Sequence, residues 1–456
     1  MPIELVPGTD LTYYLIAHDK NGKESEQDPD APAGLLTHRM LQELRDKPIT
    51  DVFIISHGWK GDIPAAREQY VRWIQAMAKC QADRDRMRAV RPDFKPLLIG
   101  LHWPSLPWGD EELGSAAGAF ALDATAGEPA GGSGLEALIA LYAERIADTP
   151  RARGALDTIF RAAMENIAPA HLSPEVCAAY QTLDAEAGLG SEGAAGAPGS
   201  DREPFDPERA YQAAEAMTQA SFGGAISAGL LGPLRQLSFW KMKDRARSFG
   251  ESGGFALLTH IEEEKPTVRI HLIGHSFGCI VVSAMVAGPG GRGNLPRPVD
   301  SLALVQGALS LWSYCPDIPV APGQAGYFHV ILGEGRVRGP ILTTQSERDT
   351  AVGTFYPAGA GVAGQIAYAP GELPRYGAVG TYGIQGLDRG VLNMPMLAAG
   401  GDYDFRAGVV YNLDATSYIR EGGGASGAHS DIARPEVAHA IWEAARQSVQ
   451  RSATPL

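Results

Sequence analysis

The chain has 456 residues, 45% of them hydrophobic, which is enough to bury the core of one large domain with an insertion or of two to three ordinary domains. Its 39 basic and 53 acidic residues give a formal net charge of −14, which disfavours nucleic acid as a partner. The four cysteines (Cys80, Cys177, Cys279, Cys315) form no C-x-x-C pair, so neither a disulfide framework nor a zinc site is predicted, and a reducing cytoplasm is expected.

The N-terminal segment predicts an edge hairpin. The first ten residues have neither a basic start nor an apolar core, so no signal peptide is expected. Residues 11–17 alternate weakly in polarity and lead to Asn21 and Gly22, a pair that favours a two-residue hairpin turn. We therefore expect an antiparallel hairpin at the edge of a sheet.

A strand-helix-strand alternation follows. Residues 51–56 form a buried-strand run, which residues 57–62 break with two glycines, and a helix is predicted over residues 65–80. A second apolar run, residues 96–103, stops at Pro104. Alternation of this kind predicts an α/β fold with a doubly wound, mostly parallel sheet.

The composition changes over residues 105–237. Strand runs vanish there, Ala, Gly and Glu become more frequent, and helical patterns such as residues 135–147 dominate. Residues 188–206 are rich in small and polar residues and predict a flexible loop. The expected organisation is a core built from residues 1–104 and 238–456, with a helical cap or lid inserted between them.

Residues 267–286 carry the most informative pattern in the chain. An apolar, β-branched run leads into a G-x-S-x-G pentapeptide from Gly274 to Gly278, and a helix-compatible run follows. This order is typical of a nucleophile elbow, whose strand-to-helix turn is so tight that the flanking glycines have no room for side chains. Ser276 is therefore the candidate nucleophile. Polar residues and glycines interrupt the apolar stretch, so no transmembrane helix is predicted.

A second G-x-S-x-G pattern occurs at residues 250–254, around Ser252. It follows residues 241–247, which are charged and helical in character and do not resemble a buried strand. A helix end or kink is the better interpretation of that pattern.

Further core elements are expected after the elbow. Residues 300–307, 340–345 and 409–413 predict strands, and residues 435–450 predict a helix with a proline near its start. Residues 353–404 are rich in glycine and tyrosine and predict loops and short helices.

A serine nucleophile needs a histidine to accept its proton. Downstream of Ser276 the sequence offers only His329, His429 and His439. His429 lies between the last predicted strand and the last helix, the usual position in strand-helix hydrolases, whereas His439 falls inside that helix. His429 is the candidate general base, and the alternative is a surface-loop histidine without a role.

The histidine in turn needs an acid to orient it. Asp349 follows the strand predicted at residues 340–345 and is the preferred candidate. Glu347 on the same loop, Asp317 and Asp414 stay open as substitutes, because a triad is defined by geometry. Asp431 better fits a residue that interacts with the dipole of the last helix.

An oxyanion hole needs two backbone N–H donors, one from the residue after the nucleophile, here Phe277. The loop that begins with His57, Gly58 and Trp59 follows an early strand and can supply the other donor from Trp59. The glycine permits the turn, and the indole can form a wall of the acyl pocket. The alternative is an ordinary turn at a strand end.

No metal or cofactor is expected. His57, His102, His271 and His275 lie on predicted strands or turns without ligand spacing such as H-E-x-x-H, and are interpreted as core or site-lining residues.

Four features together resemble the α/β-hydrolase superfamily, on its lipase and esterase side: the elbow, the His-Gly-Trp loop, the acid after a late strand and the late histidine. The resemblance covers most of the chain. The insertion looks like a cap, although superfamily caps more often follow a later strand, and residues 353–404 are long enough for a second flap. The resemblance implies a triad of Ser276, Asp349 and His429, oxyanion donors at Trp59 and Phe277, and an elbow and site lining of Gly58, Gly274, His275 and Gly278.

The leading interpretation is a cofactor-free serine hydrolase that cleaves carboxylic esters through an acyl-enzyme. Its partner would be a small-molecule ester or acyl substrate, and aliphatic faces in the insertion favour a lipid-like one. Thioester hydrolysis, amide hydrolysis and acyl transfer use the same residues. The alternative of another class is a non-catalytic interaction protein on a hydrolase scaffold.

Overall fold

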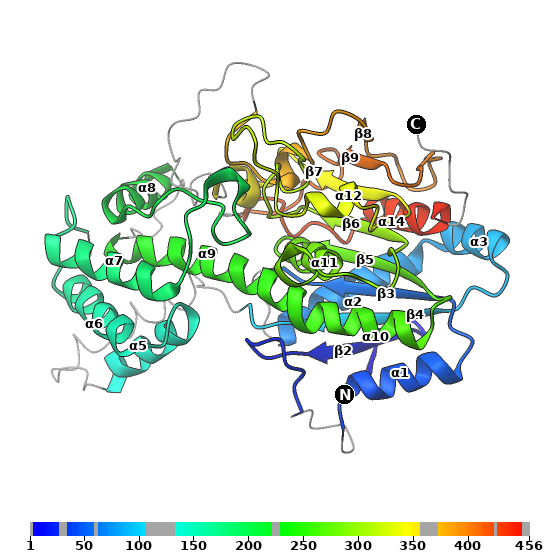
Figure 1. The fold of residues 1–456 in the computed structure, drawn as a ribbon, viewed down its shortest axis with the longest axis horizontal. Coiled ribbons are helices and arrows are strands. Elements are labelled where there is room, and N and C mark those ends of the chain that lie inside the picture. The colour runs from blue at the N-terminus through cyan, green and yellow to red at the C-terminus, as the bar shows by residue number, and fades with distance from the viewer. Residues whose placement is uncertain are drawn as a thin grey trace. The chain divides into compact units, whose positions relative to one another are not determined.

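A computed structural model describes residues 3–26, 34–58, 63–105, 133–166, 168–220, 229–355, 373–423 and 426–448 (Figure 1). The described residues fall into two compact units. One is drawn from Met1–Ser105, Arg245–Pro357 and Pro370–Leu456, and the other from Leu106–Asp244 and Ala358–Ala369.

The first unit contains one sheet. Its described strands number nine and follow the order β1-β2-β4-β3-β5-β6-β7-β9-β8. β1 is antiparallel to β2, and every other neighbouring pair is parallel. The strands are β1 (Ile3–Leu5), β2 (Thr12–Ala17), β3 (Asp51–Ser56), β4 (Pro96–His102), β5 (Arg269–His275), β6 (Ser301–Val305), β7 (Ile341–Gln345), β8 (Val391–Pro395) and β9 (Val410–Asp414). The predicted α/β class with a mostly parallel sheet is confirmed.

The register brings the ends of the central strands together. Ser56 at the end of β3 pairs with Leu101 of β4 and with Gly274 of β5. His275 at the end of β5 pairs with Val305 at the end of β6. Because these strands are parallel, the loops that follow them leave the sheet at the same edge, where open α/β sheets bind ligands.

Helices pack on both faces of the sheet. On one face, Phe53 and Ile55 of β3 share a buried cluster with Trp73 of α2 and Trp442 of α14. Helix α11 follows the elbow, is buried at all ten of its residues and contributes none of them to that cluster. No helix in the described part of the chain is both long and apolar enough to cross a bilayer. The helices of this unit are α1 (Leu36–Asp46), α2 (Ile63–Lys79), α3 (Gln81–Val90), α10 (Phe255–Glu264), α11 (Gly278–Ala287), α12 (His329–Gly333), α13 (Val379–Tyr382) and α14 (Pro435–Gln447).

The second serine pattern lies inside a helix. Residues Gly250–Gly254 form a π-helical turn between α9 (Gly232–Phe249) and α10. The Ser252 hydroxyl donates to the carbonyl of Ser248 at 2.6 Å, as a helical serine does when it bonds back one turn. A side-chain carbon at Gly250 would lie 2.6 Å from Ala284 Cβ of α11, so glycine lets the two helices approach closely.

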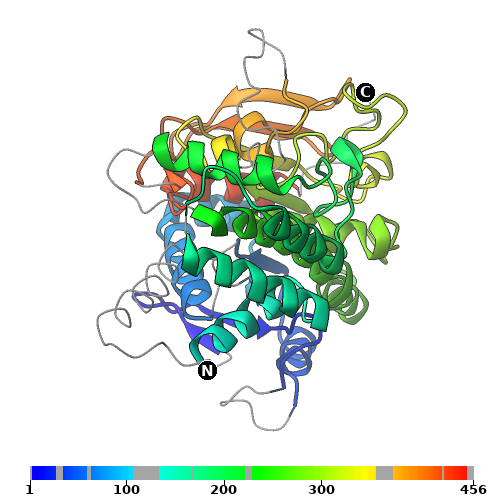
Figure 2. The same ribbon diagram turned by 90° about the vertical axis from the view of Figure 1, so that its left-hand side faces the viewer.

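The described part of the second unit is helical (cyan to green in Figure 2). Local sequence explains where two of its helices begin. Thr149 Oγ1 accepts the N–H of Ala152 at 3.1 Å, Ser173 Oγ accepts that of Val176 at 3.2 Å, and a proline follows each cap. Each cap stabilises its helix by about 1 kcal/mol. The helices are α5 (Ser133–Arg145), α6 (Pro150–Glu165), α7 (Pro174–Ala187), α8 (Pro207–Ala220) and the first part of α9.

Residues 188–206, where the sequence predicts a flexible loop, contain one short 3-10 turn and are anchored by charged pairs. The carboxylate of Asp201 lies 2.5 Å from Lys243 Nζ, and both side chains are buried. Arg202, also buried, lies 2.6 Å from Asp184 of α7. Breaking a buried pair of this kind costs about 3–5 kcal/mol, because one charge is left without a partner.

Several elements differ from the sequence expectations, and β8 and α1 are two of them. β8 lies within residues 353–404, where only loops and short helices are predicted. It is an edge strand whose Leu392 is exposed, so it has no apolar run to reveal it. Helix α1 has no counterpart in the prediction, although Leu36, Met40 and Leu44 recur every four residues and are buried.

Candidate active site

Ser276 has the backbone of a nucleophile elbow. Its φ is +55°, a value that non-glycine residues rarely adopt. A side-chain carbon at Gly274 would lie 2.6 Å from the backbone nitrogen of Cys279, and one at Gly278 would lie 2.7 Å from the carbonyl oxygen of His57. Backbone atoms cannot give way cheaply, so both flanking positions require glycine. The turn closes into α11, where the N–H of Cys279 donates to the carbonyl of Ser276 at 3.1 Å.

Asp349 and His429, 80 residues apart in the chain, are in contact. His429 Nδ1 lies 2.7 Å from Asp349 Oδ2, and the side chain of Asp349 is fully buried. Asp349 Oδ1 also accepts the N–H of Val352 at 3.2 Å. Because a carboxylate only accepts hydrogen bonds, the pair assigns a proton to Nδ1 of His429 and leaves Nε2 as the basic nitrogen.

The loop that carries His429 is fixed to the loop of Asp349. The N–H of Ala428 donates to the carbonyl of Arg348 at 2.9 Å. Gly427 has a φ of +55°, and a side-chain carbon there would lie 2.5 Å from that same carbonyl oxygen. Among the described residues no hydrogen bond joins Ser276 Oγ to His429. This does not contradict a triad, because catalytic hydrogen bonds often shorten only when substrate binds.

Of the candidate acids, only Asp349 contacts His429 in the described part of the chain. Glu347 is exposed, Asp317 accepts the N–H of Gly323, and Asp414 accepts the N–H of Thr416. Asp431 accepts the N–H groups of Arg420 and Glu421 and forms an ion pair with Arg434. Asp431 is thus a local support of the histidine loop.

The loop that follows β3 lies directly against Ser276. A side-chain carbon at Gly58 would be 3.1 Å from Ser276 Oγ and 3.0 Å from the carbonyl oxygen of His275. The carbonyl of Gly58 accepts from His57 Nδ1 at 2.8 Å and from Ser105 Oγ at 3.1 Å. Burial lowers the pKa of His57 to about 3, with a smaller contribution from the neighbouring His102, so the ring stays neutral.

Of the two expected oxyanion donors, Phe277 and Trp59, the structure describes only Phe277. Phe277 is buried and is the N-cap residue of α11, so it lies at the positive end of the helix dipole. Trp59 lies outside the described residues, and its expected role stays a prediction.

Replacing Gly58 with alanine should impair the site. The added methyl group would overlap Ser276, and a displacement of about 1 Å in a catalytic group costs roughly a hundredfold in rate. We expect kcat/KM for a p-nitrophenyl ester to fall by about that factor. Gly154→Ala in α6 is the matched control, because nothing lies within 4 Å of the added carbon. Full activity in Gly58→Ala would contradict the assignment of this loop to the site.

Two glutamines near the elbow have no counterpart in the sequence expectations. Gln69 of α2 has its amide nitrogen 3.1 Å from His275 Nδ1. Gln306, at the end of β6, is buried and has a φ of +47°. Its N–H donates to Thr344 Oγ1 at 3.0 Å. A glutamine on a helix or at a strand end has no local sequence signal for such a contact.

His271 and His102, the other two histidines interpreted as core or site-lining residues, both form contacts inside the sheet unit. His271 lies at the start of β5, where its ring contacts Ser301 and Asp51 and so serves the core. His102 Nδ1 lies 3.3 Å from His57 Nε2 and supports the ring that holds Gly58.

One group of described residues has the composition of a metal site. Ligand atoms of Asp83, His439 and Glu443 lie within 4.8 Å of one another. Arg86 already pairs with Asp83 at 2.6 Å, and Arg446 with Glu443 at 2.6 Å. His439 lies 2.8 Å from Asp83 through Nδ1. The carboxylates thus have cationic partners, and the group is a buried ion network between α3 and α14.

This network predicts a pH-dependent stability. Burial acts to lower the pKa of His439, but the hydrogen bonds to Asp83 and to the carbonyl of Gly401 outweigh it, so the pKa is raised. Burial acts to raise the pKa of Asp83, but the bonds from His439 and Arg86 outweigh it, so that pKa is lowered. The histidine therefore stabilises the fold fully below about pH 6.5, and this contribution is lost as the pH rises through its raised folded pKa. The aspartate stabilises the fold fully above about pH 3.9, and this stabilisation is lost as the pH falls through its lowered folded pKa.

We therefore expect the difference in free energy of unfolding between wild type and His439→Asn to be largest from about pH 4 to pH 6.5 and to shrink above that range. Urea unfolding at a series of pH values measures this difference. In an Asp83→Asn background the dependence should change, because the largest contribution that raises the pKa of His439 is removed while the bond to the carbonyl of Gly401 and the charge of Glu443 remain. A difference that stays constant up to pH 9 would contradict the interpretation.

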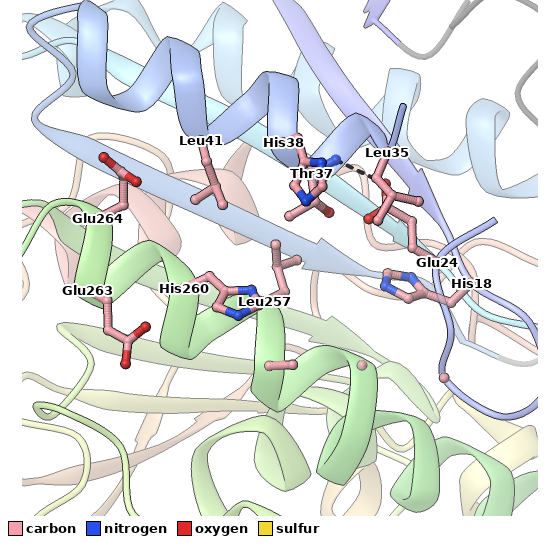
Figure 3. A pocket seen from close by; sticks show the side chains of 13 residues that line it. His18, Glu24, Leu35, Thr37, His38, Leu41, Leu257, His260, Glu263 and Glu264 are labelled. Atoms are coloured by element: carbon pink, nitrogen blue, oxygen red, sulfur yellow. Dashed lines mark hydrogen bonds between the residues drawn. The ribbon is translucent and has the colours of Figure 1, made fainter. Parts of the chain in front are cut away.

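A concavity lies apart from Ser276, Asp349 and His429, and its lining residues are drawn in Figure 3. It has a volume of about 490 Å³, and its lining comes from the turn after β2, from α1 and from α10. The lining includes His18, His38, His260 and three glutamates, and Glu24 accepts the N–H of Thr37 there. None of the three candidate triad residues borders it.

Comparison of the chain with protein-family models, with curated proteins and with solved structures finds no match.

Proposed function

We propose that this chain is a serine hydrolase with the α/β-hydrolase fold that cleaves carboxylic esters through an acyl-enzyme on Ser276. The observation that carries the proposal is the left-handed backbone of Ser276 between two glycines that cannot be replaced without a collision. A non-glycine residue in this region costs on the order of 1–3 kcal/mol, and strain of this kind gathers at functional sites.

The contact between Asp349 and His429 supports the general base. With the proton on Nδ1 held by the carboxylate, Nε2 of His429 would accept the proton of Ser276 as Oγ attacks the carbonyl carbon. The imidazolium would then give that proton to the leaving alcohol as the tetrahedral intermediate collapses to the acyl-enzyme. Water would repeat the sequence with the acyl-enzyme and release the acid.

The developing oxyanion would be bound by the N–H of Phe277 at the start of α11, with the N–H of Trp59 as the second donor. The helix dipole favours negative charge at this position. One such donor contributes about 2.7–4 kcal/mol to the stability of the transition state.

Hydrolysis of a substrate panel tests the proposal. The panel combines p-nitrophenyl esters from acetyl to long acyl chains with a matched thioester and a matched anilide. We expect a burst of p-nitrophenol with the esters, followed by slower turnover, because acylation by an activated ester is faster than hydrolysis of the acyl-enzyme. The preferred chain length would reveal whether the substrate is lipid-like. Absence of turnover on every member would favour a non-catalytic interaction protein.

A further inference from the structure

His275, the residue before the nucleophile, has both ring nitrogens engaged. Nε2 lies 2.9 Å from the carbonyl oxygen of His429, and Nδ1 lies 3.1 Å from the amide nitrogen of Gln69. Because a carbonyl only accepts, Nε2 carries the proton, and Nδ1 accepts from the amide. This is the opposite tautomer to that of His429.

The ring is enclosed by the residues it links. Only 4% of His275 is exposed. Its ring centroid lies 4.8 Å from that of His429, and the rings of His275 and Trp73 of α2 are nearly perpendicular, with centroids 6.4 Å apart. Burial, followed by repulsion from His429, lowers the pKa of His275 well below its usual range. The ring therefore stays a neutral donor when His429 becomes protonated.

This contact differs from the others that hold His429. The bond to Asp349 and the bond between Ala428 and Arg348 both attach the histidine loop to the acid loop after β7. The bond from His275 instead attaches it to β5, the strand that carries Ser276. It thus fixes the loop relative to the nucleophile.

We propose that His275, oriented by Gln69, is a positioning residue that holds the backbone of His429 against the nucleophile strand and so sets the imidazole beside Ser276. The inference rests on the proposed hydrolase function for its kinetic consequences. Its structural part, the attachment of the loop to β5, is independent of that function.

Two substitutions of His275 separate the hydrogen bond from packing. His275→Phe keeps an aromatic ring and loses the donor, whereas His275→Gln keeps a donor of similar reach. We expect His275→Phe to lower kcat for p-nitrophenyl acetate and the rate of fluorophosphonate labelling by roughly ten- to a hundredfold, with KM little changed. His275→Gln should recover most of both rates.

A substitution of Gln69 tests the tautomer. Gln69→Glu has nearly the same shape but would accept the proton of Nδ1. In the neutral ring this leaves Nε2 without a proton to donate to His429, so the rates are compared at alkaline pH, where the ring is neutral. We expect a loss of the same order as in His275→Phe. Gln75→Leu is the control on the same helix, because that amide donates to the carbonyl of Pro7 and should not affect the rates.

Hydrogen exchange of peptides covering residues 426–434 supplies a readout that does not depend on activity. Faster exchange in His275→Phe than in wild type and His275→Gln, at unchanged melting temperature, would support the inference. This holds even if wild type fails to react with ester or phosphonate. In that case only the proposed function fails. A reactive wild type together with an equally reactive His275→Phe would overturn the inference and leave the function standing. Unchanged exchange in an inert protein would overturn both.

Discussion

Replacing Ser276 with alanine is expected to lower kcat/KM for ester hydrolysis by roughly 10⁴-fold or more, because the nucleophile of the acylation step is lost and no acyl-enzyme can form. The side chain is buried and small, and alanine loses only the hydroxyl, so the fold should be kept. Steady-state kinetics with a p-nitrophenyl ester measure the loss, and circular dichroism checks the fold.

Ser252→Ala is the matched control for this variant. Ser252 stands in the same five-residue pattern but lies in the π-helical turn, with its hydroxyl bonded to the preceding helical turn. We expect it to hydrolyse the ester at the wild-type rate. Equal losses in the two variants would remove the basis for choosing the elbow serine.

Asp349→Asn is expected to lower kcat by about 10⁴-fold with little change in the fold. An amide in place of the buried carboxylate no longer favours the proton on Nδ1 of His429, so Nε2 loses its role as the base. It also no longer stabilises the imidazolium that forms when the serine is deprotonated. The pH dependence of kcat in both proteins separates this effect from a general loss of stability.

Glu347→Gln removes a carboxylate from the same loop and serves as the control. Glu347 is exposed, and it is the alternative acid closest to Asp349 in the chain. We expect Glu347→Gln to keep the wild-type kcat. A larger loss in Glu347→Gln than in Asp349→Asn would reassign the orienting acid.

The central strands could be predicted from sequence because they are buried on both faces. β3 has six buried residues and the bounds predicted for it, and β5 and β7 differ from their predicted runs by at most a few residues. β8 could not be predicted, because it is an exposed edge strand that is held in place by its pairing with β9 and by the contact of Asn393 with Asn412. Such long-range pairing leaves no periodic pattern in the sequence.

In the candidate site, too, features with a local sequence pattern could be predicted, and contacts between residues far apart in the chain could not. The elbow could be predicted because two glycines and a serine between an apolar strand and a helix form a local pattern, and the structure supplies the steric reason for both glycines. The choice among the acids depends on where loops meet, and only the contact between Asp349 and His429 distinguishes them. The contact of Gln69 with His275 spans 206 positions and has no local signal.

Peptide mapping by mass spectrometry after incubation with a fluorophosphonate tests whether Ser276 is an activated nucleophile, because the reagent reacts with such a serine whatever the natural substrate is. We expect one adduct per chain on the peptide that contains Ser276. This adduct should be absent in Ser276→Ala and should form much more slowly in Asp349→Asn. An adduct on another serine, or labelling that persists in Ser276→Ala, would contradict this expectation.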